Sequence, residues 1–185
     1  MELRKQIEKY VPINEQEEKD KELLLEWLSE PDVFTRKNKR AHFTASAWVV
    51  NKERTKVLMI YHNIYNSWAW MGGHADGMED LLVVAEKEAK EESGITDITP
   101  LSEDIASLEI VTVSGHEKRG EYVSAHLHLN ATYIFEAPEE QVLSIKPDEN
   151  SGVMWIETDD IKNKSTEEWF VKRIYPKLID KMKKM

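Results

Sequence analysis

The 185-residue chain has no cysteine, which excludes disulfides, thiolate metal sites and cysteine nucleophiles. No apolar run approaches the roughly 18 residues of a membrane-spanning helix, and the first residues, MELRKQIEKYV, lack the apolar segment of a secretory signal. We therefore expect a cytoplasmic protein. Positive charge is scarce, because 25 Lys and Arg face 35 Asp and Glu and give a formal net charge of -10. This balance disfavours general nucleic-acid binding but allows a small anionic substrate, because a bound metal can invert the local field.

The composition, with 41% hydrophobic and 32% charged residues, is that of a folded globular chain. Residues 1–40 are rich in Glu and Lys and are expected to be helical. We expect them to form an N-terminal extension and not an independent domain, because they are too few to bury a core of their own. Asn14 and Glu17 have the spacing of a helix capping box. An apolar stripe follows and should dock on the main domain, which we place at 41–185: Leu23, Leu24, Leu25, Trp27 and Leu28.

Beyond residue 40, the sequence alternates between strand-like and helix-like periods. The pattern predicts a helix at 80–93 and strands at 44–50, 56–62, 67–71, 107–114, 125–135 and 153–158. Ser165 and Glu168 have capping spacing for a last helix, which Pro176 should kink or break. Helices inserted between strands indicate an α/β layered domain.

Glycine is rare, yet three of the seven glycines fall between Gly72 and Gly77, at the start of GGHADGMEDLLVVAEKEAKEESGI. In the helix that follows, Glu88, Glu91 and Glu92 lie within an arc of about 100°, at the edge of the expected core contact. Like charges at this spacing destabilise a helix, and a divalent cation with oxygen ligands removes the repulsion. A solvated acidic face is the alternative, and the preceding glycine-rich loop favours a ligand site.

This stretch resembles the Nudix box, G-x5-E-x7-R-E-U-x-E-E-x-G-U, in which U is a bulky apolar residue. The positions in register are Gly73, Glu79, Glu88, Glu91, Glu92, Gly94 and Ile95. Lys87 stands where the family has Arg, Ala89 is small for its apolar position, and Met71 replaces a frequent Pro. Lys87 offers a positive charge to Glu79 but cannot form the two parallel hydrogen bonds that Arg forms. We expect this difference to affect the rigidity of the loop and not the metal site.

The resemblance implies a Nudix-type α/β/α sandwich with a mixed sheet, carrying the N-terminal helical extension. It also implies an Mg²⁺- or Mn²⁺-dependent hydrolase that cleaves the diphosphate linkage of a nucleoside diphosphate derivative, such as a nucleoside triphosphate or sugar nucleotide. By position, Glu88 and Glu92 would be the main metal ligands, and Glu91 a further ligand or the base that activates water. The Gly73 carbonyl would add a ligand. Glu79 would orient the loop and helix through Lys87, in a loop that begins at Gly72.

A fourth acid outside the box often serves as base or ligand in this family. The candidates are Glu149, which precedes the late strand, and Glu121. We favour Glu149 because of its place before that strand, and a solvated loop acid is the alternative.

Other polar and aromatic residues allow two interpretations each. His74 follows the glycine pair and would touch phosphate or stabilise the loop. His126 and His128 share one face of a strand, but a second metal site needs more ligands, so we expect hydrogen-bonded strand histidines. The basic run Arg36–Arg40 would guide polyphosphate or form a solvated loop, and Trp68 and Trp70 are expected to pack in the core.

Two other functions are compatible with the resemblance. A nucleotide-binding sensor would keep the fold and lose the chemistry, which the near-complete set of box Glu residues argues against. Isopentenyl-diphosphate isomerases share the fold but rely on a Cys, and this chain has none. The expected partner is a small diphosphate substrate, without nucleic acid or membrane, and a homodimer is left open. The sequence identifies neither the physiological substrate nor the general base.

Overall fold

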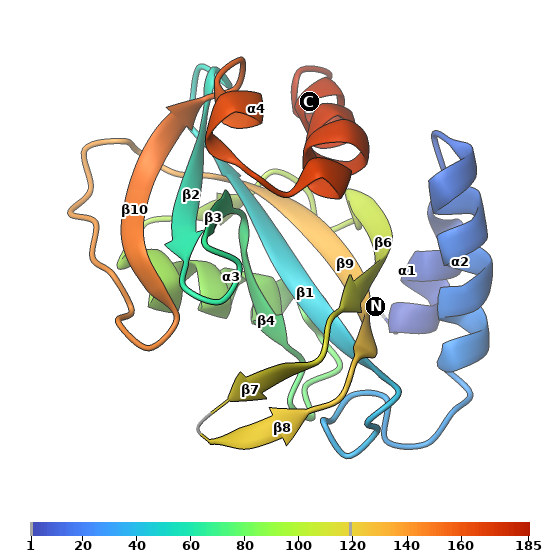
Figure 1. Cartoon of the computed structure of the whole chain (residues 1–185). Helices are drawn as coiled ribbons and strands as arrows, with labels where there is room; N and C mark the ends of the chain where they lie inside the picture. Colours follow the sequence, from blue (N-terminus) through green and yellow to red (C-terminus); the bar gives the residue numbers. More distant parts are fainter. Residues whose placement is uncertain (1, 119) are drawn as a thin grey trace.

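The computed structural model describes residues 2–118 and 120–185 and has an α/β fold built around a mixed β-sheet (Figure 1). One helix, α3, covers one face of the sheet, the C-terminal helices cover the other, and α1 and α2 lie along one side (Figure 1). The α/β fold with a mixed sheet and preceding N-terminal helices is therefore confirmed. None of the helices in the described part of the chain has the length and apolar character that a membrane crossing requires.

The helices of the described chain are α1 (Leu3–Lys9), α2 (Glu15–Trp27), α3 (Leu81–Ser93), α4 (Ile161–Lys164), the π-helical turn η1 (Phe170–Ile174) and α5 (Tyr175–Met182). The strands are β1 (Ala41–Val50), β2 (Lys56–His62), β3 (Ser67–Ala69), β4 (Met71–His74), β5 (Thr99–Pro100), β6 (Ser107–Val113), β7 (His116–Lys118), β8 (Glu121–Val123), β9 (His126–Glu136) and β10 (Asn150–Glu157).

Strand β1 is the centre of the sheet. It runs parallel to β9 from the pair Ala41 and Leu127 to the pair Val50 and Glu136, and antiparallel to β2 and β4. The order β10-β2-β1-β9 is completed by β3 on β2 and by β5 and β6 on β9, while β7 and β8 form a separate hairpin. Every residue of β1 is buried, as expected for a strand covered on both faces.

The two faces of β1 differ in chemistry because successive side chains point to opposite sides. Phe43, Ala45 and their alternate neighbours join the core with Leu81 and Ala85 of α3. On the other face, Trp48 belongs to the core under the C-terminal helix. The first part of that second face is polar and buried: His42, Thr44 and Ser46. The sheet therefore carries a polar end that α5 does not cover with apolar side chains.

Two segments depart from the sequence-based expectation. The strand predicted at 67–71 divides at Trp70, because Ser67–Ala69 pairs with β2 whereas Met71–His74 pairs with β1. The last helix contains the π-helical turn η1 immediately before α5, with Pro176 in the first turn of α5. Proline lacks an N–H and cannot continue an α-helical hydrogen-bond ladder, so the expected break takes this form.

The N-terminal helices are fastened by apolar contacts and by a buried ion network. Leu24 is buried in the core, while Leu23 of the expected stripe is exposed. The Asn14 side chain accepts a hydrogen bond from the Glu17 N–H at 2.9 Å, and the Glu17 carboxylate accepts from the Ile13 N–H at 3.0 Å. This arrangement caps α2 much as a capping box does.

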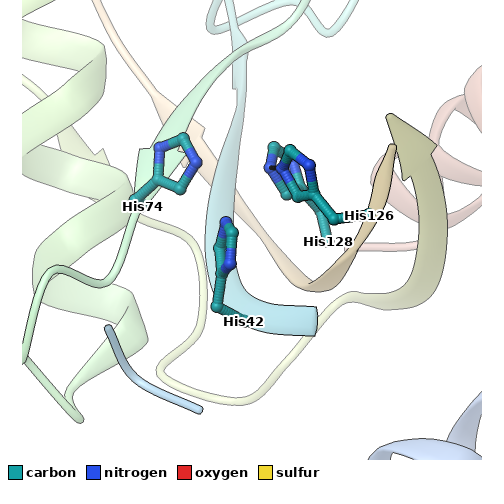
Figure 2. Close-up of side chains that lie close together, drawn as sticks. All are labelled: His42, His74, His126 and His128. Carbon is teal, nitrogen blue, oxygen red and sulfur yellow. Dashed lines mark hydrogen bonds between the residues drawn. The ribbon is translucent and has the colours of Figure 1, made fainter. Parts of the chain in front are cut away.

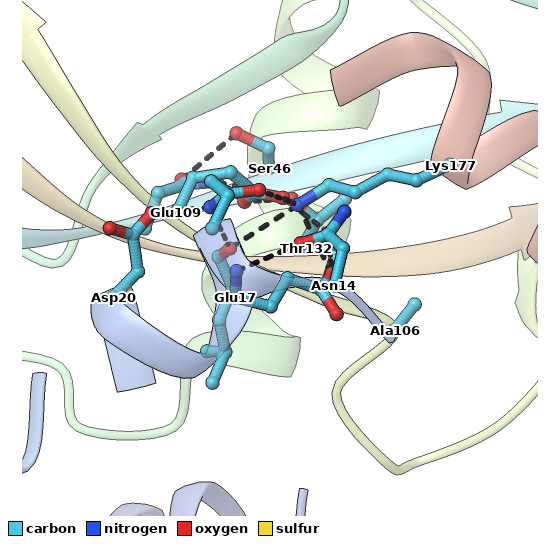
Figure 3. A network of polar contacts seen from close by, with 12 residues as sticks. Asn14, Glu17, Asp20, Ser46, Ala106, Glu109, Thr132 and Lys177 are labelled. Atoms are coloured by element: carbon cyan, nitrogen blue, oxygen red, sulfur yellow. Dashed lines mark hydrogen bonds and ion pairs between the residues drawn. The ribbon is translucent and has the colours of Figure 1, made fainter. Parts of the chain in front are cut away.

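Glu17 is also the centre of the ion network, which joins α2 to α5 and to the sheet (Figure 3). Its carboxylate lies 3.1 Å from the Lys177 ammonium and 2.9 Å from that of Lys181, and Glu109 of β6 lies 2.9 Å from Lys177. Glu17 is 0% exposed and Lys177 is 5% exposed. Burial alone would raise the pKa of Glu17, but Lys177, the Tyr10 hydroxyl and Lys181 together lower it to about 2.

Candidate active site

The glycine pair of β4 brings the backbone close to helix α3. A Cβ at Gly73 would lie 2.5 Å from the carboxyl carbon of Glu88, so a side chain there would displace that carboxylate. The N–H of Gly72 donates a hydrogen bond of 3.0 Å to Oε2 of Glu92. The glycine pair of β4 therefore contacts α3 through the carboxylates of Glu88 and Glu92.

Helix α3 begins and ends where its sequence provides caps. The Asp80 side chain accepts a hydrogen bond from the Val83 N–H at 3.3 Å, and Gly94 ends the helix with φ 78°. A residue at that φ is left-handed, which glycine adopts without a steric cost. These caps fix the length of α3 and keep its acidic residues beside β4.

Three carboxylates from two elements meet at this point. Glu88 and Glu92 come from α3 and Glu149 from the turn before β10, and one oxygen of each lies within 4.8 Å of the others. The Asn150 side chain donates a hydrogen bond of 2.9 Å to the Glu92 carbonyl, which holds this turn against the end of α3. The sequence-based candidates Glu88, Glu92 and Glu149 thus lie together, whereas Glu121 lies on β8 of the hairpin.

The carboxylate of Glu92 is buried beside two other carboxylates. Glu92 is 2% exposed. Burial raises the pKa of Glu92 well above its ordinary value, and the charges of Glu149 and Glu88 raise it further, against the hydrogen bond from Gly72. A bound cation would relieve this repulsion, so the electrostatics fit a positively charged ligand.

Glu91 is more exposed than its neighbours and is held by two lysines. Its carboxylate lies 3.3 Å from the Lys87 ammonium and 3.3 Å from that of Lys146. Lys87 also lies 3.1 Å from Glu88, and Lys146 lies 3.0 Å from Glu149. Although burial disfavours its charged form, the pKa of Lys146 is raised by Glu149 and Glu91. The two lysines therefore stand at the rim of the carboxylate group, where they could face substrate phosphates.

Two of the expected supporting contacts take a different form. Within residues 2–118 and 120–185, Lys87 pairs with Glu88 and Glu91, and no ion pair joins it to Glu79, which is exposed. His74 points away from the carboxylates because it alternates with Gly73 along β4. Its ring instead lies 5.0 Å from that of His42 and 4.8 Å from that of His128.

The remaining candidates lie in ordinary contacts. Arg36 forms a bidentate ion pair with Asp76, at 2.8 and 2.6 Å, and Arg40 lies 2.9 Å from Glu30. Trp68 and Trp70 are partly buried and pack against the core under α5, as expected.

Three residues at or near these sites are not predicted from the sequence: Lys146, Asn150 and His42. Lys146 stands three residues before Glu149, but only the fold shows that it also reaches Glu91. His42 carries no local signal, because its neighbours depend on how β1 pairs with β9 and β4.

The residues present fit a hard divalent cation. Mg²⁺ and Mn²⁺ prefer oxygen ligands, and Mg²⁺ commonly uses one or two carboxylates together with substrate phosphates. Glu88, Glu92 and Glu149 supply such oxygens close together, and burial and the neighbouring carboxylates raise the pKa of Glu92, which a bound cation would oppose.

Comparison with known proteins gives the class of this fold and site. The sequence matches the NUDIX domain over residues 40–178, which is well over half of the chain. The chain therefore belongs to the NUDIX domain family. It is a Nudix hydrolase, a pyrophosphohydrolase of a family that typically depends on divalent metal and acts on diphosphate substrates.

Solved structures share the fold at low sequence identity. A NUDIX-family hydrolase from Clostridium perfringens is 22% identical with a TM-score of 0.53, covering 74% of this chain and 95% of that chain. A C. elegans Ap4A hydrolase in a binary complex is 19% identical with a TM-score of 0.53, covering 77% and 95%. The E. coli dihydroneopterin triphosphate pyrophosphohydrolase is 13% identical with a TM-score of 0.55, covering 75% and 94%. A search of curated proteins found no significant match.

Proposed function

We propose that this Nudix hydrolase uses Mg²⁺ or Mn²⁺ to cleave the diphosphate linkage of a nucleoside diphosphate derivative, such as a nucleoside triphosphate or a sugar nucleotide. The observation that carries the proposal is the convergence of Glu88, Glu92 and Glu149 beside the glycine pair of β4. The similar structures named as Ap4A hydrolase and dihydroneopterin triphosphate pyrophosphohydrolase are in keeping with a substrate that contains linked phosphates.

Glu88 and Glu92 are the proposed main ligands, with Glu149 beside them and the Gly73 carbonyl as a further ligand. A divalent cation held there would neutralise charge on the diphosphate oxygens and favour attack by water. The Gly72 N–H keeps one oxygen of Glu92 in a fixed orientation at 3.0 Å. Ligands held in this way need little rearrangement when the substrate binds.

We assign the proton-accepting role to Glu149 in preference to Glu91. Two lysines contact Glu91, and although burial alone would raise its pKa, Lys146 and Lys87 lower it. A carboxylate with a lowered pKa is a weaker base. In the described part of the chain, Glu149 has one lysine partner, Lys146, and it lies within the carboxylate group. Glu91 would then keep Lys87 and Lys146 at the rim, where their charges attract the substrate phosphates.

A screen of nucleoside di- and triphosphates, sugar nucleotides and dinucleoside polyphosphates with Mg²⁺ or Mn²⁺, with products identified by mass, tests the proposal. We expect metal-dependent release of phosphate, pyrophosphate or a nucleoside monophosphate from one class. Glu92→Gln should abolish release in a folded protein. Glu86→Gln is the matched control, because Glu86 lies on the same helix but pairs with Lys90 at 2.6 Å.

Tight nucleotide binding without turnover under either metal would overturn the proposal in favour of a sensor. Conversion of isopentenyl diphosphate would instead indicate an isomerase.

A further inference from the structure

Four of the six histidines of the chain lie together on the polar end of the sheet. His42 comes from β1, His74 from β4, and His126 and His128 from β9. They meet because His42 pairs directly with His128, and His74 pairs with Thr44, two residues further along β1 on the same face. Figure 2 shows the rings from these three strands turned toward one another.

The distances between the rings are those of a compact group. One ring nitrogen of each histidine lies within 4.8 Å of the other three. The Nε2 atoms of His126 and His128 lie 3.2 Å apart. In a tetrahedral zinc site with bonds of 2.0–2.1 Å, neighbouring ligand nitrogens are about 3.4 Å apart. No pair would have to close by more than about 1.4 Å, the difference between the limit of 4.8 Å and that value, and side-chain rotation can provide such a movement.

His42 presents a buried nitrogen that has no hydrogen-bond partner among the residues that the structure describes. Its Nδ1 lies 3.0 Å from the Asn38 carbonyl, which can only accept, so Nδ1 carries the hydrogen and Nε2 keeps its lone pair. That Nε2 is buried and has no partner within residues 2–118 and 120–185, and His42 as a whole is 4% exposed. A buried polar atom left without a hydrogen bond costs free energy, and binding of a metal ion to this nitrogen would remove that cost.

His126 is oriented in the same way. Its Nδ1 lies 2.8 Å from the Ser124 carbonyl, which leaves Nε2 directed at His128. Metal-binding histidines usually donate their second ring N–H to a carbonyl or carboxylate, which fixes the ring. Two of the four histidines thus already have the outer contact that a metal site requires.

We propose that His42, His74, His126 and His128 form a binding site for a divalent transition-metal ion, with Zn²⁺ the best match. Imidazole nitrogens suit Zn²⁺, whereas Mg²⁺ requires oxygen ligands, so this site would not compete for the ion at the carboxylates. Four protein ligands complete a tetrahedral zinc site and leave no open position, which is typical of a structural site.

The proposed ion would also steady the glycine pair. His74 directly follows Gly73 on β4, and an ion on His74 would tie that strand to β1 and β9 on the face opposite Glu88. Of the two roles that the sequence leaves open for His74, phosphate contact and stabilisation of the loop, the proposal favours the second, through a bound metal ion.

Titration calorimetry of the full chain with ZnCl₂ in excess Mg²⁺ tests the site, because the Mg²⁺ occupies carboxylates that would otherwise bind Zn²⁺. We expect one Zn²⁺ per chain and X-ray absorption that shows nitrogen ligands at about 2.0 Å. His42→Gln and His126→Gln should each weaken Zn²⁺ binding more than tenfold. The matched controls are His62→Gln and His116→Gln, which should stay within twofold of the parent, and Glu92→Gln should also retain Zn²⁺ binding.

Absence of Zn²⁺ binding to the parent chain would overturn the proposal, as would equal losses in the control and cluster variants, or an absorption spectrum dominated by oxygen ligands. Circular dichroism checks that each variant is folded. Should His42→Gln fail to fold, His126→Gln and a zinc-dependent rise in Tm of the parent decide the outcome.

Discussion

Glu17 and Glu92 are both buried carboxylates on helices, yet their surroundings shift the pKa in opposite directions. Lys177 and Lys181 face Glu17, and the balance of burial and ion pairs lowers its pKa to about 2. Burial raises the pKa of Glu92, and the nearby Glu149 and Glu88 add to the effect. A buried acid with its own cations fastens the fold, whereas a buried acid among other acids is prepared for a cation from solution.

The largest effect expected from this difference is on stability. Glu17→Gln should lower the free energy of unfolding by about 3–5 kcal/mol, because it removes the carboxylate that faces Lys181 and leaves Lys177 with Glu109 alone. Chemical denaturation measures the loss. Glu18→Gln, on the exposed side of the same helix, is the control and should change stability by less than about 0.5 kcal/mol. Equal effects of the two substitutions would show that the ion network does not fasten α2.

The pH dependence of stability sharpens the same point. Because the pKa of Glu17 falls from 4.5 to about 2 on folding, its contribution is fully present above pH 4.5 and is lost as the pH falls toward 2. The shift corresponds to about 3 kcal/mol. Denaturation of the parent and of Glu17→Gln between pH 2 and pH 6 should therefore converge at the acid end. A difference that stays constant over this range would exclude the assignment.

For Glu92 the expected effect is on turnover. Glu92→Gln should reduce kcat/KM by at least about 100-fold, because metal-assisted charge stabilisation contributes several kcal/mol. Its stability without divalent cation should equal or exceed that of the parent, since the substitution removes an uncompensated buried charge. Steady-state kinetics and thermal unfolding measure the two quantities. If Glu92→Gln lost much stability and kept its turnover, Glu92 would stabilise the fold, as proposed for Glu17, and would not bind the catalytic metal.

Added Mg²⁺ should raise the Tm, which is a smaller effect and should depend on Glu92 but not on Glu17. At 100 times its Kd, a ligand of the folded state stabilises by about 2.7 kcal/mol. We expect a rise in Tm with Mg²⁺ for the parent and for Glu17→Gln at a pH where it folds, and none for Glu92→Gln. A rise that persists in Glu92→Gln would place the ion elsewhere.

The features that could be predicted from the sequence are those set by residues close together along the chain. The acidic arc of α3 and its Gly94 cap follow from spacing within one helix, and the place of Glu149 before a strand predicts its role at the site. Contacts that depend on the pairing of distant strands were not available from spacing. His42 meets His128 only through the parallel register of β1 and β9, and the division at Trp70 arises because β3 and β4 have different partners.

Anomalous diffraction from crystals soaked in Mn²⁺ is the most direct measurement of the central claim, that the carboxylates beside the glycine pair hold the catalytic cation. We expect a manganese peak bounded by the side chains of Glu88, Glu92 and Glu149. A peak at another position, with these three carboxylates free of metal at a Mn²⁺ concentration that supports turnover, would contradict it.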